Sequence, residues 1–258
     1  YPLYMKPFDG GGWRGVSRVG DEGELMTAYD ASSQTMMHLQ RGLENFDIFV
    51  RALAIGPQVN IFHYDPTRPM HDRYQVSSNF LAPEHAAEAT AVVKTINAFF
   101  RWEFNSCESI LKDGILQPID FANACPDVAI VSLHYHFPWA IKSLLAWSLF
   151  CVASDRPMRL DMNSHDYLAI ADSERSYPEK LAAYEALADA YFETERFTEF
   201  RATQLSHLDQ VMWELAQAQE FDDMLVHNVR LIFPAHEQEQ FIAHFRGLIA
   251  AWVQAEAR

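Results

Sequence analysis

Short apolar runs separated by turn residues dominate the first half of the chain, and they predict strands. These runs are Leu3–Met5, Val16–Val19, Met36–Leu39, Asp47–Ile55 and Val59–Phe62. Gly56-Pro57, a turn dipeptide, joins the last two. A surface helix or turn is expected over residues 21–33, and a helix opens at Pro83 and runs to about Phe100.

Helical spacing replaces this pattern from about Ser132 onward. Pro138–Val152 predicts a buried helix, and the segment opening at Tyr177-Pro178 places apolar residues on one helical face. Phe200–Ala218 and Gln238–Ala255 continue the helical pattern. We therefore predict an α+β fold, with a mixed or antiparallel sheet in residues 1–127 and a mostly helical region in residues 128–258.

Composition limits the classes of function. The chain has 258 residues and a net charge of −15, and both halves are acidic, so we expect neither a nucleic-acid nor an anionic-membrane partner. No apolar run approaches the roughly 20 residues that span a bilayer. The three cysteines, Cys107, Cys125 and Cys151, show no zinc or disulfide spacing, which indicates a reducing cytoplasm.

A glycine-rich loop follows the first predicted strand. Lys6 precedes it, and the loop reads Gly10-Gly11-Gly12-Trp13-Arg14-Gly15. Glycines allow backbone N–H groups to turn onto an anion, while Lys6 and Arg14 add positive charge, so this hairpin can bind phosphate. An ordinary glycine-rich hairpin with a surface lysine explains the loop equally well. The spacing matches neither a Walker motif nor a dinucleotide fingerprint.

A second polar constellation surrounds Asp113-Gly114, a strong hairpin signal between two apolar runs. This hairpin brings Glu108 on its first strand near Asp120 and Asn123 on its second. Two carboxylates and an amide oxygen form the hard, all-oxygen site that Mg²⁺ prefers. Glu103 is the alternative first carboxylate, but Glu108 matches the distance of Asp120 from the turn. A solvated Glu108, with Asp120 capping the next turn, is the alternative to a metal site.

These two motifs, in this order, resemble the ATP-grasp family over residues 1 to about 127. The resemblance rests on the lysine before the glycine loop and on the Asn123-to-Pro126 spacing after an acidic residue. Asp120 stands where the family more often has Glu, with one extra residue before Asn123. Such enzymes use ATP and Mg²⁺ to activate a carboxylate as an acyl phosphate, which an amine or similar nucleophile then captures. The family has a preceding domain, which we expect upstream of residue 1.

The resemblance implies further site residues. Lys6 and the glycine loop would contact the ATP phosphates, Gln40 the adenine edge and Asp47 the ribose. Arg73 lies where related enzymes direct an arginine toward the acyl phosphate. Arg51 interrupts an apolar strand, so it either pairs with a carboxylate or holds substrate. The substrates would be a small-molecule or peptide carboxylate and an amine.

Two other functions remain open. A non-catalytic nucleotide-binding or scaffold protein with an ATP-grasp fold accommodates the departures around Asp120. A zinc hydrolase would use His134 and His136, which share one face if their segment is extended, although no third ligand is evident. His165, Asp166 and Cys151 carry no signature of a hydrolase nucleophile.

Overall fold

The computed structural model describes residues 1–11 and 14–257, and the chain divides into two compact units, Tyr1–Asp47 and Ile48–Arg258. Gly12 and Trp13 lie outside the described residues. The change in composition near residue 127 falls inside the second unit. A shared apolar core explains this, because Ile55 and Ala98 pack with Trp147 and Phe192 from the helical half.

The first unit contains a three-stranded antiparallel sheet in the order β2-β1-β3. Its elements are β1 (Leu3–Pro7), β2 (Ser17–Val19), the helix α1 (Glu22–Ala31) and β3 (Met37–Arg41). The Asp21 side chain accepts a hydrogen bond from the Glu24 backbone N–H and begins α1, which has no buried residue. Both the glycine hairpin and the surface helix were predicted from the sequence, and both predictions are confirmed.

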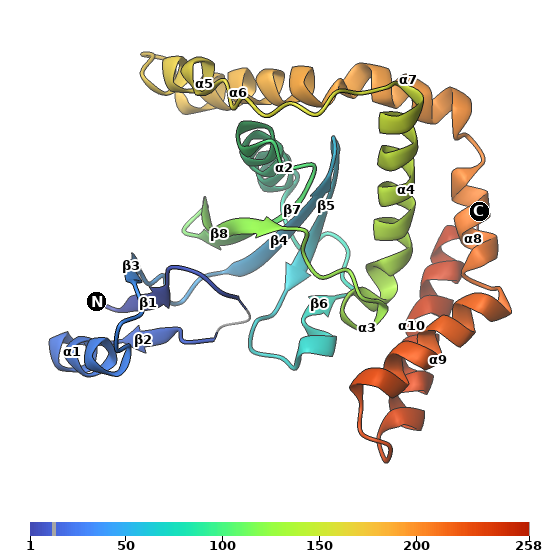
Figure 1. Ribbon diagram of the computed structural model, residues 1–258, viewed down its shortest axis with the longest axis horizontal. Helices are drawn as coiled ribbons and strands as arrows, with labels where there is room; N and C mark the ends of the chain where they lie inside the picture. Colours follow the sequence, from blue (N-terminus) through green and yellow to red (C-terminus); the bar gives the residue numbers. More distant parts are fainter. Residues whose placement is uncertain (12–13, 258) are drawn as a thin grey trace. The chain divides into compact units, whose positions relative to one another are not determined.

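The second unit is built on a five-stranded sheet in the order β6-β5-β4-β7-β8, in which all neighbouring strands are antiparallel (Figure 1). Its strands are β4 (Ile48–Ile55), β5 (Gln58–Tyr64), β6 (Tyr74–Gln75), β7 (Phe104–Lys112) and β8 (Ile115–Ala124). Asp113 and Gly114 close the β7–β8 hairpin with φ values of 52° and 74°. Two successive positive φ angles are typical of the type I′ turn that Asp-Gly favours.

Helices cover both faces of this sheet (Figure 1). α2 (Pro83–Phe100) packs its Ala89 and Val93 against the face formed by Val50, Ala52 and Ala54. On the other face, Phe62 lies against the rings of His136 and Trp139. The sheet is therefore buried on both sides where these elements meet.

The remaining helices belong to the helical half. They are α3 (Ile130–Leu133), α4 (Phe137–Ala153), α5 (Ser164–Ala171), α6 (Tyr177–Phe192), α7 (Thr194–Gln204), α8 (Leu208–Leu215), α9 (Gln219–Ile232) and α10 (Gln238–Glu256), with short 3₁₀ turns η1 (Met70–Asp72) and η2 (His134–His136). The fold is thus α+β with antiparallel sheets followed by helices, as the sequence predicted. α5 and α9 were missed, and the helix expected over 200–218 is instead two helices.

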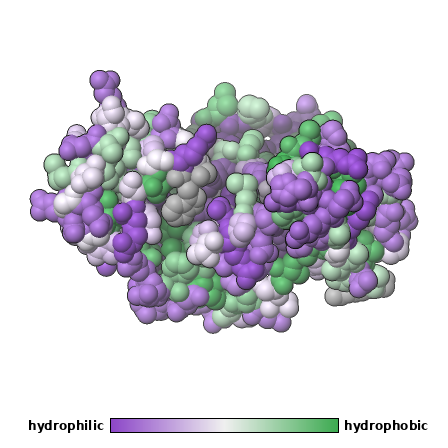
Figure 2. Space-filling model, turned by 90° about the horizontal axis from the view of Figure 1, so that it is seen from below, coloured by the Kyte–Doolittle hydropathy of each residue, from purple (hydrophilic) through white to green (hydrophobic). Residues whose placement is uncertain are grey.

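α4 differs from the buried helix that we expected. Its Ala146, Trp147 and Phe150 are buried, whereas Leu145, Leu149 and Val152 are exposed on the opposite side. Figure 2 shows apolar patches among polar side chains on the face seen from below. Within the part of the chain that the structure describes, no helix is both long and apolar enough to span a membrane.

Gly56 provides a test of how the β4–β5 turn and α4 fit together. Its φ is +55°, and a Cβ atom added there would overlap the Trp147 indole. Gly56→Ala should lower the free energy of unfolding by about 2–4 kcal/mol, through backbone strain and overpacking. Gly114→Ala is the matched control, since its φ is +74° but no atom lies within 4 Å of the added Cβ. It should cost about 1 kcal/mol.

Urea unfolding of both variants, compared at unchanged m-value, measures the difference. Equal losses of stability in the two variants would contradict the close approach of Trp147 to the turn.

Candidate functional site

A row of charged side chains runs across three neighbouring strands of the larger sheet, from the central strand β4 to the edge strand β8. Arg51 on β4 pairs in register with Glu108 on β7, and Glu108 pairs with Asp120 on β8. Directly paired residues on neighbouring strands point to the same face of a sheet. The structure therefore brings Glu108 and Asp120 together, as the sequence predicted, and adds Arg51 beside them.

Irregularities in β8 explain how Asn123 joins the same face. Residues 120 and 123 are three apart, so in a regular strand their side chains would point in opposite directions. Ser106 pairs with Asn123 and Glu108 with Asp120, so that the register shifts between them. A bulge of this kind absorbs the extra residue, and Asn123 Nδ2 donates to Asp120 Oδ1 at 3.2 Å.

Pro118 accounts for a second register shift. Glu108 pairs with Asp120 but Ser109 pairs with Pro118, which leaves one extra residue on β8. Because β8 is at the edge of the sheet, it tolerates a proline without a donor N–H. The sequence has one residue more between Asp120 and Asn123 than the ATP-grasp pattern. The bulged backbone of β8 absorbs this residue, so that the two side chains stay in contact.

Arg51 forms an ion pair with this group. Its Nη1 lies 3.3 Å from Glu108 Oε1, and Nη2 donates to Ser106 Oγ at 3.0 Å. The side chains of Arg51 and Glu108 are only 15% and 13% exposed. Arg51 was predicted either to pair with a carboxylate or to hold substrate, and here it pairs.

Two tyrosine rings complete the surroundings of Arg51. Its guanidinium carbon lies 5.2 Å from the centre of the Tyr64 ring and 5.6 Å from that of Tyr74. Burial would lower the pKa of Arg51, but Tyr74 in the ionised form that it takes only at high pH and the Glu108 carboxylate raise it above its ordinary value. Burial raises the pKa of the Tyr74 hydroxyl. Arg51 therefore stays charged and Tyr74 stays neutral across the physiological range.

Other candidate ligands near this row belong to different environments. Burial raises the pKa of Cys107 to about 12, so it remains a thiol. Glu103 accepts hydrogen bonds from Arg156 Nη1 at 2.8 Å and from the Tyr191 hydroxyl at 2.6 Å. The preference for Glu108 over Glu103 agrees with this geometry, since Glu103 ties the end of the sheet to the helical half.

The glycine hairpin belongs to the first unit. Lys6 pairs with His38 and Tyr4 with Gln40, so Lys6 and Gln40 share one face of the three-stranded sheet. Gly10 and Gly15 have φ values of 117° and 71°, as expected of glycines that turn the backbone.

Other predicted residues of this unit lie at its surface. The Arg14 backbone N–H and Nε both donate to the Gly11 carbonyl oxygen, at 3.4 Å and 3.3 Å, so the arginine folds back onto its own loop. Asp47 is exposed at the end of the unit. The structure thus leaves the predicted nucleotide contacts as predictions.

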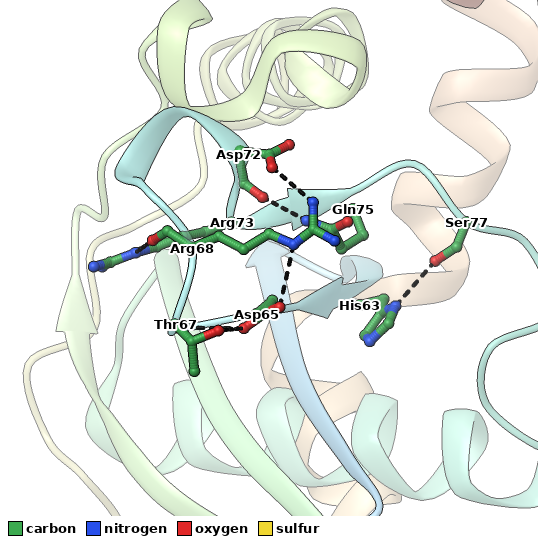
Figure 3. Close-up of polar contacts among 8 residues, drawn as sticks. All are labelled: His63, Asp65, Thr67, Arg68, Asp72, Arg73, Gln75 and Ser77. Carbon is green, nitrogen blue, oxygen red and sulfur yellow. Dashed lines mark hydrogen bonds and ion pairs between the residues drawn. The ribbon is translucent and has the colours of Figure 1, made fainter.

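Arg73 lies at the end of the loop between β5 and β6 (Figure 3). Arg68 organises this loop, with its Nε 3.2 Å from Asp65 Oδ2 and its Nη1 2.7 Å from Asp72 Oδ2. Arg73 Nε donates to the Arg68 carbonyl oxygen at 3.0 Å. Its guanidinium points away from both carboxylates (Figure 3). Within the described part of the chain it forms no ion pair.

The expectation that His134 and His136 lie on an extended segment is wrong. Both belong to η2, a 3₁₀ turn that His134 begins with φ of 38°. His134 Nδ1 accepts from the Tyr135 backbone N–H at 2.8 Å, and His136 Nε2 lies 3.2 Å from the Gln75 carbonyl oxygen. Among the described residues, no three His, Cys, Asp or Glu side chains can hold a metal ion. Within the described residues, His134 and His136 therefore have no further side chains with which to form a zinc site.

The fold and this site define an α+β protein that carries a carboxylate–arginine cluster on its larger sheet. No protein-family model matches the sequence, and no curated protein matches it. Among solved structures, the chain is similar to a D-alanine–D-alanine ligase from Helicobacter pylori, with 13% identity and a TM-score of 0.43. The match covers 56% of this chain and 47% of the ligase, so the chain spans about half the length of that protein. Identity this low carries no information about substrate.

The two histidines of η2 make stability depend on pH. Burial lowers the pKa of His134 and of His136 to about 4. Because the unfolded chain binds protons near pH 6.5, it takes up more protons than the folded state as the pH falls. Stability is therefore full above pH 6.5 and is lost between pH 6.5 and 4. Each histidine should cost about 2 kcal/mol between pH 7 and pH 5.

His136→Gln should remove one of these contributions while keeping a donor for the Gln75 carbonyl oxygen. Urea unfolding at pH 7 and pH 5 should show a loss that is smaller by about 2 kcal/mol in the variant. A loss identical to that of the wild type would show that His136 is not held neutral by burial.

Proposed function

We propose that this protein is an ATP- and Mg²⁺-dependent ligase that joins a carboxylate to an amine. The observation that carries the proposal is the pairing of Glu108 with Asp120 across β7 and β8, with Asn123 bonded to Asp120. It is the arrangement expected from the ATP-grasp resemblance, and it survives an altered spacing only because β8 is bulged.

The donor set suits Mg²⁺. Two carboxylates on one face provide hard oxygens, and Mg²⁺ typically takes one or two carboxylates and completes its octahedron with waters and substrate phosphates. In this structure the Asn123 amide nitrogen donates to Asp120. If a cation were bound at Asp120, the Asn123 amide would favour the orientation in which its oxygen faces the cation. Bound here, Mg²⁺ would neutralise phosphate charge and orient the terminal phosphate.

The other residues take roles in binding. We propose that Lys6 and the loop residues Gly10, Gly11, Gly12, Trp13, Arg14 and Gly15 bind the phosphates. Gln40 reads the adenine edge and Asp47 accepts from the ribose. Arg73 would meet an anionic substrate group, and the direction of its terminal nitrogens, away from the loop carboxylates, supports this role.

The reaction balances without a further reagent. A substrate carboxylate oxygen attacks the γ-phosphorus of ATP, the bond to the β-phosphate oxygen breaks, and ADP leaves. The amine nitrogen then attacks the acyl carbon, phosphate departs and the nitrogen loses a proton. In this proposal Arg51 and Arg73 position the substrate and offset the negative charge that builds up during phosphoryl transfer. The three cysteines are free, which supports the cytoplasmic location expected from the sequence.

Asp120→Asn tests the proposal, because it removes a carboxylate charge and preserves the shape of the side chain. We expect the wild type to release ADP in the presence of Mg²⁺ and a panel of carboxylates and amines. The variant should lose this activity by at least about 100-fold, a scale typical of removing one electrostatic catalytic contact. Its urea midpoint should stay close to that of the wild type.

Asp161 lies in the segment between α4 and α5. The substitution Asp161→Asn is the matched control, and it should leave turnover unchanged. Wild-type protein that binds ATP·Mg²⁺ without ever releasing ADP would instead favour the non-catalytic nucleotide-binding protein. Equal turnover in Asp120→Asn and the wild type would show that the β7–β8 hairpin does not form the metal site.

A further inference from the structure

Glu108 has a resident partner in the protein as it stands. Arg51 lies at ion-pair distance from it, on the neighbouring strand and on the same face. A divalent ion bound by Glu108 and Asp120 would therefore approach a carboxylate that already contacts a guanidinium. A cation and Arg51 repel each other, so both cannot keep their closest contact with Glu108.

Arg51 has other contacts that hold it when Glu108 is taken. Its Nη2 and Nε lie 3.0 Å and 3.4 Å from Ser106 Oγ, and the rings of Tyr64 and Tyr74 lie beside its guanidinium. An arginine with these contacts can loosen its ion pair without leaving the site. The partial burial that makes an unpaired charge costly then favours a new anion beside it.

The charges of the cluster point the same way. Glu108 and Asp120 contribute two negative charges and Arg51 one positive charge, so the three side chains together carry −1. Adding a divalent cation changes this sum to +1. The site thus changes from one that repels anions to one that attracts them only after the cation has bound.

We propose that Arg51 is a positioning residue that holds Glu108 until a divalent cation arrives, and then turns its free guanidinium nitrogens to the substrate anion. This inference rests on the proposed function and adds an order to it, in which cation binding precedes and strengthens binding of an acidic substrate group. Because coupling is reciprocal, an anion in the site also tightens the cation.

The test measures the affinity of the full chain for Mn²⁺ alone, without nucleotide, from the loss of the free-ion paramagnetic resonance signal. Arg51→Met removes the competing charge and keeps most of the side-chain volume. It should bind Mn²⁺ at least about tenfold more tightly than the wild type, since a nearby like charge is gone. The double variant Arg51→Met/Glu108→Gln should not show this increase in Mn²⁺ affinity, because the Glu108 carboxylate that would bind the ion has been replaced.

Arg246→Met is the matched control. It removes an arginine that pairs with Asp222 of α9, with its Nε 2.6 Å from Asp222 Oδ1, and it should leave Mn²⁺ affinity unchanged. Arg51→Gln, which retains a donor for Ser106 Oγ, gives the same readout if Arg51→Met does not fold. Circular dichroism establishes that each variant is folded.

The outcomes separate the two proposals. If the wild type binds ATP·Mg²⁺ but Arg51→Met and Arg51→Gln bind Mn²⁺ no more tightly than it does, the role of Arg51 is overturned and the ligase proposal stands. If the wild type binds neither ATP·Mg²⁺ nor Mn²⁺ and the Arg51 variants do not gain Mn²⁺ binding, both fail. Tighter Mn²⁺ binding in the Arg51 variants, lost with Glu108→Gln, supports the inference.

Discussion

The placement of two carboxylates side by side on a mostly covered sheet face is the constraint from which the rest of the site follows. Glu108 and Asp120 are direct partners across β7 and β8, so their charges cannot separate without breaking the hairpin. Such a pair requires positive charge nearby. Arg51 supplies it in the protein alone, held by Ser106 and two tyrosine rings, and a bound cation would supply it during the proposed reaction.

The helical half gives this sheet its rigidity. Phe62, the partner of Arg51 on β5, packs against His136 and Trp139, and Trp147 closes over the Gly56 turn. Glu103, which directly precedes β7, accepts hydrogen bonds from Arg156 and Tyr191. Helices without any recognisable motif therefore position the site, which explains why the composition changes near residue 127 although the compact unit does not end there.

Local signals predicted most of the elements. Asp113-Gly114, Pro83 and the glycines after Pro7 each dictate a turn or a helix start through their own backbone preferences, and each element was found. α9 was missed although Phe221, Leu225 and Val229 recur at helical spacing on one buried face. The helix expected over 200–218 breaks near Leu205, where Leu205 and Leu208 both turn into the core around Trp147.

The site was predictable only in part. Glu108, Asp120 and Asn123 are joined by one hairpin, so their proximity followed from a short turn. The ion pair between Arg51 and Glu108 joins strands that are distant in sequence, and nothing local indicates which carboxylate Arg51 meets. The backbone of His134 could not be foreseen either, since its positive φ depends on how η2 packs against β5 and β6.

The central claim is that the bulged β7–β8 hairpin binds a divalent cation through Glu108 and Asp120. Anomalous X-ray scattering from a crystal of the protein grown with ATP and Mn²⁺ tests it most directly, because it locates the metal independently of any activity. The account predicts a manganese peak within coordination distance of both carboxylates, with Arg51 turned away from Glu108. Ordered nucleotide with manganese bound only elsewhere, and Arg51 still paired with Glu108, would contradict it.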